Sequence, residues 1–120
     1  MSKTVLVVDD EPDVRISVGQ VLEMSGYKVI QAENGLDCLK KLQHVTPDLL
    51  VLDIMMPGMS GWDVAAKLRE NPSWSDIPIV FLTAKGDDMS VGMGKATSVE
   101  YITKPFDIIE FKRRIEEILQ

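Results

Sequence analysis

Short apolar runs that stop abruptly at polar residues place the strongest constraint on how this chain folds. They occupy residues 5–8, 49–52 and 79–82, and a fourth, shorter segment covers 101–103. The polar residues that follow them are, in chain order, Asp9 and Asp10, Asp53, Thr83, and Lys104. Such a run, when Pro or Gly follows soon after, indicates a buried strand that carries a polar group at its exposed end. If the strands are parallel neighbours, three carboxylates, a hydroxyl and an ammonium group meet at one edge. That set suits a divalent metal ion and a phosphoryl group.

Helix-like segments alternate with these strands. Pro12 suits the first position of a helix, where its missing N–H costs nothing. The next three helix starts carry capping residues: Asn34, Ser60 with Asp63 three residues on, and Asp107. The periodicity therefore predicts a helix after each of these positions.

Two more elements complete the alternation: a strand over residues 28–32, and a helix somewhere in residues 87–96. Leu36, Leu39 and Leu42 are expected to face inward from the second helix. Five strands that alternate with five helices predict a parallel α/β sheet covered on both faces. Right-handed crossovers leave few topologies, and we predict the flavodoxin-like, doubly wound (βα)5 order 2-1-3-4-5.

The predicted order places the candidate residues where ligands bind in such sheets, at the carboxyl ends of the first and third strands. No linker, repeat or low-complexity segment interrupts the 120 residues. We therefore expect one domain over residues 1–120, with no output domain in this chain.

Composition narrows the classes of partner. The net charge of −6 disfavours direct binding to nucleic acid. No apolar stretch reaches the roughly 20 residues of a membrane span, and the amino terminus enters a strand directly, without a signal-peptide pattern. A single cysteine cannot form an internal disulfide. A cytoplasmic protein without membrane contact is expected.

The predicted cluster needs a cation. Two carboxylates about 4 Å apart repel each other by roughly 4 kcal/mol at an effective dielectric constant near 20. Mg2+ suits such a site, because it prefers oxygen ligands and is usually held by a few carboxylates together with phosphate oxygens. Asp53 could then act as a nucleophile toward a phosphoryl group, with Lys104 and Thr83 supplying a positive charge and a hydroxyl to its oxygens.

The full set of motifs resembles the response-regulator receiver domain of two-component signalling, over essentially the whole chain. The motifs are Asp9-Asp10-Glu11, then Asp53 followed by Met55-Met56-Pro57-Gly58, then Thr83-Ala84, and finally Lys104-Pro105-Phe106. The resemblance implies that Asp53 accepts a phosphoryl group from a phosphohistidine on a sensor histidine kinase or a phosphotransfer protein. It also implies that the domain controls a downstream protein and catalyses only its own phosphorylation and dephosphorylation.

The resemblance also assigns roles to individual residues. Asp10 would bind Mg2+ directly, Asp9 mainly through water, and the Met55 carbonyl would complete the set with Asp53. The Lys104-Pro105 bond would be cis, which X–Pro chemistry allows. In the family's switch, Thr83 moves toward the phosphoryl group and an aromatic residue, here Tyr101, turns inward. The surface formed by the fourth helix, the fifth strand and the fifth helix would then change.

Two features depart from the family pattern. Thr97-Ser98 replaces a common Gly-Ala pair, and the spacing from Thr83 to Lys104 is one residue short. The same stretch holds three glycines, each of which costs a helix interior about 1 kcal/mol relative to alanine. We therefore predict a short or irregular helix within residues 87–96.

Other readings fit less well. A P-loop around Gly94-Lys95 would need Ser or Thr where Ala96 stands and its first Gly where Met89 stands. A flavodoxin would place a flavin phosphate against Asp-Asp-Glu, and a haloacid-dehalogenase-type phosphatase expects an acid where Met55 stands. A binding module that works without phosphorylation remains the main alternative. Homodimerisation on phosphorylation stays open.

Overall fold

The computed structural model describes residues 2–84 and 99–120. Its elements are β1 (Thr4–Val8), α1 (Pro12–Met24), β2 (Lys28–Ala32), α2 (Gly35–Leu42), β3 (Leu49–Asp53), α3 (Gly61–Glu70), β4 (Ile79–Ala84), β5 (Val99–Lys104) and α4 (Ile108–Ile118). The label α4 thus denotes the helix that the sequence predicted as the last of the chain. The helix predicted within residues 87–96 lies outside the described residues.

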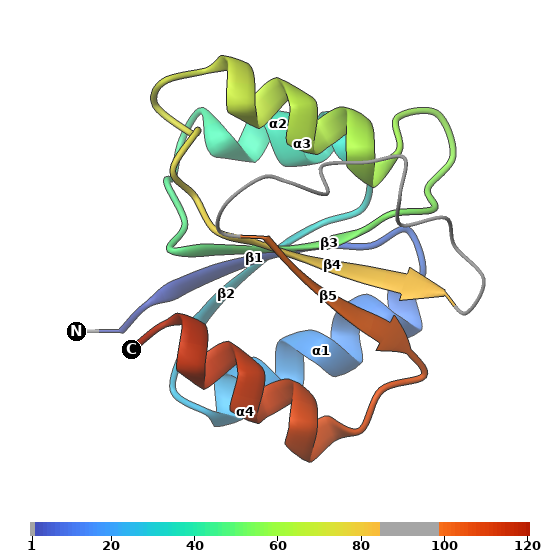
Figure 1. Ribbon diagram of the computed structural model, residues 1–120, viewed down its shortest axis with the longest axis vertical. Helices are drawn as coiled ribbons and strands as arrows, with labels where there is room; N and C mark the ends of the chain where they lie inside the picture. The colour runs from blue at the N-terminus through green and yellow to red at the C-terminus, as the bar shows by residue number, and fades with distance from the viewer. Residues whose placement is uncertain (1, 85–98) are drawn as a thin grey trace.

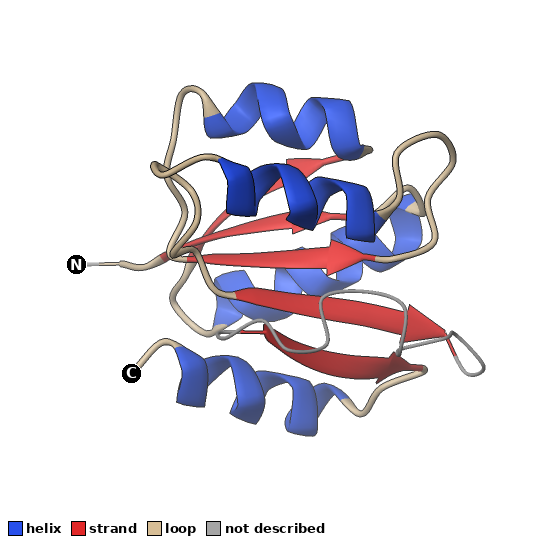
Figure 2. Cartoon of the chain, turned by 45° about the horizontal axis from the view of Figure 1, so that its top comes forward, coloured by secondary structure: helices blue, strands red, loops and turns tan. Residues whose placement is uncertain are grey.

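The five strands form one parallel sheet in the order β2-β1-β3-β4-β5. This confirms the predicted topology, in which β1 and β3 lie side by side although β2 separates them in sequence. Helices α2 and α3 cover one face, and α1 and α4 cover the other (Figures 1 and 2). The sheet is therefore the middle layer of three, and all its strands point their carboxyl ends to the same edge.

Alternate residues of the central strands enter two separate cores. Leu50 and Leu52 of β3 pack under α2 and α3, whereas Leu49 and Val51 pack under α1 and α4. These four side chains have no exposed surface. Burial on both faces explains why the strand sequence is continuously apolar rather than alternating.

Side-chain caps begin three helices as the sequence predicted. The Asn34 side chain accepts a hydrogen bond from the Asp37 N–H, and the Asp107 side chain accepts two from the first turn of α4. Ser60 and Asp63 form a reciprocal capping box at the start of α3. Each cap satisfies backbone N–H groups that the helix itself leaves without a partner.

One detail of α2 was predicted wrongly. Leu36 is 64% exposed, whereas Cys38 and Leu42 are buried and Leu39 packs partly against the core. The buried face follows residues 35, 38 and 42, and Leu36 lies to one side of it because successive residues turn by about 100° around an α-helix. Within the described residues, no helix combines the length and the apolar character needed to cross a membrane.

Candidate functional site

The carboxyl ends of four strands bring the predicted site residues together. Asp9 follows β1, Asp53 ends β3, Thr83 is the next-to-last residue of β4, and Lys104 ends β5. The register places Asp53 beside Leu82, and Thr83 beside Thr103. Asp9, Asp53 and Thr83 are the buried polar residues among those described. The fold thus buries polar groups at the edge that the sequence predicted.

Four acidic side chains form a compact cluster at this edge. Asp9, Asp10, Glu11 and Asp53 each offer a carboxylate oxygen, and these atoms lie within 4.8 Å of one another. The Asp9 carboxylate is held by the Glu11 N–H, which donates to its Oδ1 at 2.9 Å. Oxygen ligands at this spacing suit a hard divalent cation.

Among the described residues, Lys104 is the cation that faces this cluster. Its Nζ lies 3.2 Å from Asp9 Oδ2, 3.3 Å from Asp53 Oδ1 and 3.5 Å from Glu11 Oε1. Asp9 and Asp53 are buried at these contacts, whereas Glu11 is largely exposed. A single ammonium group therefore bridges the ends of β1 and β3 from β5.

Burial and crowding change the protonation of these groups. Burial, and then the neighbouring Asp9 carboxylate, raise the pKa of Asp53 to about 7, although Lys104 opposes the shift. Burial also raises the pKa of Asp9, against the opposing effects of the Glu11 N–H and Lys104. Burial alone would lower the pKa of Lys104, but Asp9 and Asp53 raise it above its ordinary value. Within the described part of the chain, Lys104 therefore does not fully offset the burial and crowding of these carboxylates.

The Thr83 hydroxyl has a partner that the sequence analysis did not identify. Its Oγ1 donates a hydrogen bond to Thr103 Oγ1 at 3.3 Å, across the β4–β5 pair. The strand register alone would have suggested this contact, because Thr83 and Thr103 pair directly. Thr83 therefore stands at the edge of the acidic site with its hydroxyl engaged on the β5 side.

Tyr101 packs against aromatic rings on the α3 face of the sheet. Its ring stacks on Phe81 with centroids 5.6 Å apart, and Phe81 contacts Trp62 at 4.6 Å. The Tyr101 hydroxyl is buried and has no hydrogen-bond partner among the described residues. This aromatic group joins β4, β5 and the first turn of α3.

The loop after β3 is pressed against the start of α3. The Gly61 N–H donates to the Ile54 carbonyl at 2.8 Å. A Cβ on Gly61 would lie 2.5 Å from the Asp53 carbonyl oxygen, so this close approach requires glycine. Met55 has a 66% exposed side chain in this loop, and a ligand role for its carbonyl stays a prediction. The Lys104-Pro105 peptide bond is cis.

Sequence reasoning also missed Arg15 and Gln31. The Arg15 side chain reaches from α1 to the Asp9 carbonyl and to the Gln31 side chain. Both residues lie outside the motifs that follow the strands, and a lone arginine on a helix carries no sequence signal of such a contact.

Fold and site together define a doubly wound α/β domain with a buried aspartate, an acidic cluster and a lysine at one edge. A family model described as the response regulator receiver domain matches residues 5–116. The chain belongs to this family. It is a receiver domain of the two-component response regulators, a class that signals through phosphorylation.

Individual relatives agree with this assignment. The phosphate regulon transcriptional regulatory protein PhoB of Pseudomonas aeruginosa is 39% identical over 121 residues, which cover 100% of this chain and 53% of that protein. A putative response regulator from Chloroflexus aurantiacus superposes with a TM-score of 0.90 at 32% identity, covering 99% of this chain and 98% of that one. The response regulator protein TrrA from Thermotoga maritima, solved in complex with Mg(2+)-BeF, superposes with a TM-score of 0.86 at 38% identity. The match covers 98% of this chain and 99% of that one. The chain spans about half the length of the curated relatives it matches.

Proposed function

We propose that this domain is a phosphorylation-dependent switch that accepts a phosphoryl group on Asp53 from a phosphohistidine. The donor is a sensor histidine kinase or a phosphotransfer protein. One observation carries the proposal: the buried Asp53 carboxylate lies 3.3 Å from the Lys104 ammonium group, inside a cluster of four acidic residues. A carboxylate in this setting can attack phosphorus while the neighbouring cation neutralises charge on the phosphoryl oxygens.

The acidic cluster fits Mg2+ as the cofactor. Its donors are oxygens within 4.8 Å of one another, and the one lysine that contacts them in the described part of the chain, Lys104, does not balance four carboxylates. Asp10 and Asp53 would hold the ion directly, Asp9 mainly through water, and the Met55 carbonyl would add a ligand. When bound, Mg2+ supplies charge neutralisation between the carboxylates and the phosphoryl oxygens. TrrA, solved in complex with Mg(2+)-BeF, supports this choice.

The remaining residues position and respond to the phosphoryl group. Lys104 binds one phosphoryl oxygen as a point charge, and Thr83 offers its hydroxyl to another after leaving Thr103. The domain turns over only its own phosphoryl group, by phosphorylation and slow hydrolysis, and is not an enzyme acting on other substrates. Membership of the receiver family, rather than a substrate pocket, supports this limit on its activity.

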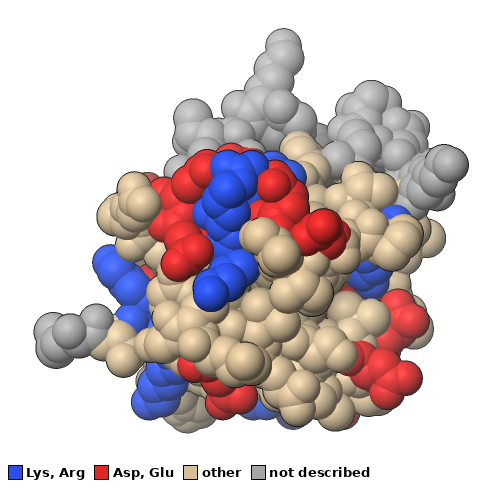
Figure 3. All heavy atoms as spheres, turned by 90° about the horizontal axis from the view of Figure 1, so that it is seen from below, with Lys and Arg blue, Asp and Glu red and all other residues tan. Residues whose placement is uncertain are grey.

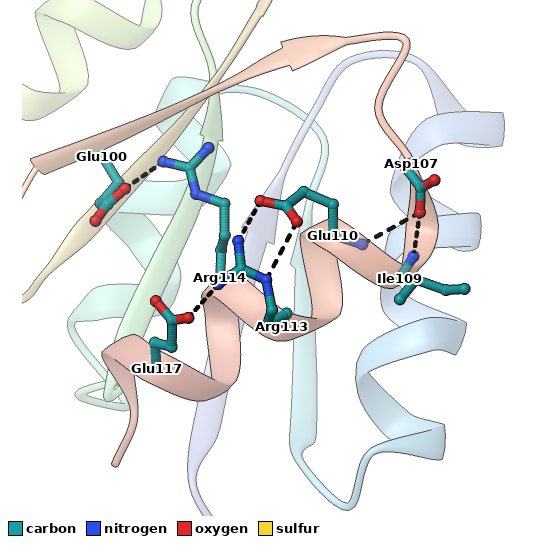
Figure 4. A network of polar contacts seen from close by, with 7 residues as sticks. All are labelled: Glu100, Asp107, Ile109, Glu110, Arg113, Arg114 and Glu117. Carbon is teal, nitrogen blue, oxygen red and sulfur yellow. Dashed lines mark hydrogen bonds and ion pairs between the residues drawn. The ribbon is translucent and has the colours of Figure 1, made fainter.

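The signal leaves through β5 and α4, together with the helix predicted within residues 87–96. Movement of Thr83 is coupled to the position of Tyr101 on the neighbouring strand. Glu100, next to Tyr101, forms an ion pair with Arg114 of α4 (Figure 4). Arg113 pairs with Glu110 and Glu117 on the same helix. A downstream protein, or a second phosphorylated copy, would bind this surface.

The domain does not contact nucleic acid directly in this proposed function. The net charge is −6, and the face seen in Figure 3 mixes basic with acidic side chains instead of gathering basic ones alone. The single cysteine, Cys38, is free and buried, which fits a reducing compartment such as the cytoplasm.

Intact mass spectrometry tests the proposal. The domain is incubated with Mg2+ and a small acyl phosphate, with Asp53→Asn in parallel. We expect one phosphoryl group on the wild type, none on Asp53→Asn, and none on either when Mg2+ is chelated.

The alternative is an interaction module that works without phosphorylation. It predicts no mass gain from a phosphohistidine donor or an acyl phosphate, and no Mg2+ binding that Asp10→Ala removes. That pair of results would overturn the switch, whereas a slow reaction with the acyl phosphate alone would not.

A further inference from the structure

Arg15 connects the first helix to the acidic turn. Its Nη1 donates a hydrogen bond to the Asp9 carbonyl oxygen at 2.8 Å. Its Nε donates to Gln31 Oε1 at 3.2 Å. The guanidinium group is planar and its donors are fixed relative to one another, so these two contacts together determine where the group lies.

Gln31 holds the guanidinium group from the neighbouring strand. It lies in β2 opposite Val7 of β1 and is only partly exposed. A Cβ on Gly19 would lie 3.3 Å from Gln31 Nε2, so the glycine in α1 leaves room for this side chain. The Gln31 carbonyl also accepts a hydrogen bond from Lys41 Nζ at 2.5 Å. The Gln31 backbone is thus held by α2, and the Gln31 side chain supports Arg15 from the strand next to β1.

The Asp9 carbonyl is a sensitive place for such a contact. It belongs to the peptide group that joins Asp9 to Asp10, and the plane of that group sets the direction in which Asp10 leaves the chain. From the other side, the Glu11 N–H holds the Asp9 carboxylate at 2.9 Å. The turn that presents both aspartates is thus fastened at two points, and Arg15 provides one of them.

We propose that Arg15, supported by Gln31, is a positioning residue of the metal site. It orients the Asp9–Asp10 peptide so that the two carboxylates converge with Asp53 on one cation. This inference rests on the proposed function, because it assumes that the cluster binds Mg2+. Removing an outer partner of a metal ligand commonly lowers metal affinity by about 10- to 100-fold.

Substitutions at the two residues separate geometry from charge. Arg15→Lys keeps the positive charge but loses the two-point contact, and Gln31→Met keeps Arg15 but removes its support. Arg69→Lys in α3 is the matched control, because Arg69 also contacts backbone carbonyls, those of Ser75 and Ile77, but at the amino end of β4, away from the acidic cluster. Mg2+ affinity is measured by calorimetric titration of each folded variant, alongside its melting temperature without metal.

We expect Arg15→Lys and Gln31→Met each to raise the Kd for Mg2+ by about 10-fold, and Arg69→Lys to leave it unchanged. The double variant should bind no more weakly than the weaker single variant, because both changes break the same bridge. Gln31→Met keeps the Arg15 side chain and its charge, so it tests the bridge even where Arg15→Lys lowers stability.

Wild-type affinity in both single variants would overturn the inference and leave the proposed function intact. Losses that multiply in the double variant would also overturn it, since they would mean two independent effects. Absence of Mg2+ binding by the wild type would instead overturn the proposed function, and this inference with it.

Discussion

The middle of β3 and its carboxyl end are three residues apart, and burial affects the residues at these two positions in opposite ways. Leu50 is buried among apolar side chains and needs no partner of any specific kind. Asp53 is buried to nearly the same degree, yet its carboxylate lies beside another carboxylate and one lysine. The first environment stabilises the fold, whereas the second opposes ionisation of the residue it holds. Burial of apolar side chains in the core therefore offsets the free-energy cost of burying the Asp53 carboxylate.

Truncation of the strand interior should have the largest effect on stability. Leu50→Ala removes a side chain with no exposed surface and leaves a cavity under α2 and α3. We expect the free energy of unfolding to fall by about 2–5 kcal/mol. Urea unfolding, followed by circular dichroism, measures this change. Leu36→Ala, at an exposed leucine of α2, is the matched control and should change stability by less than about 1 kcal/mol.

Neutralising the strand end should act in the opposite direction. Without metal at about pH 8, Asp53→Asn removes a buried negative charge whose folded-state pKa is raised to about 7. We expect the free energy of unfolding to rise by on the order of 2–3 kcal/mol. Urea unfolding in a chelator measures it. With Mg2+ present, the wild type should instead be the more stable of the two, because the ion binds the wild type more tightly than the variant.

The pH dependence provides the control for this comparison. Folded Asp53 has a pKa raised from 3.8 to about 7, so the folded state holds a proton that the unfolded chain releases. Its contribution to stability is therefore complete below about pH 4 and is lost as the pH rises through about 7. The difference in the free energy of unfolding between Asp53→Asn and the wild type should therefore grow over this interval and stay constant above it. A gap of equal size at about pH 5 and pH 8 would contradict the assignment.

Tyr101→Phe should have the smallest effect. The ring keeps its stacking on Phe81, and the lost hydroxyl is buried without a hydrogen-bond partner among the described residues. We expect a change of less than about 1 kcal/mol in the free energy of unfolding. Tyr101→Ala, which also removes the ring, should cost several times more in the same measurement. Equal losses in both variants would show that the hydroxyl, rather than the ring, stabilises this edge.

The alternation of strands and helices predicted the sheet order, and the polar residues at the strand ends predicted the convergence of Asp9, Asp53, Thr83 and Lys104. It did not predict Arg15 or Gln31, whose contact depends on how far α1 tilts over β2. Leu36 was misplaced for a related reason: helical periodicity fixes the spacing of a face but not its rotation toward the sheet. Local patterns thus determine which residues end each strand, and tertiary packing determines which side chains support them.

The ion pair between Asp9 and Lys104 has a consequence for protein synthesis. These residues lie 95 positions apart, so the first and last strands must both be present before the pair can form. A ribosome releases β1 and β3 well before β5. During that interval the carboxylates at the ends of β1 and β3 have no ion pair with Lys104. An unfinished chain therefore contains Asp9 without Lys104, the cation that pairs with it. A truncated product that ends before β5 therefore lacks the ion pairs that join these carboxylates to Lys104.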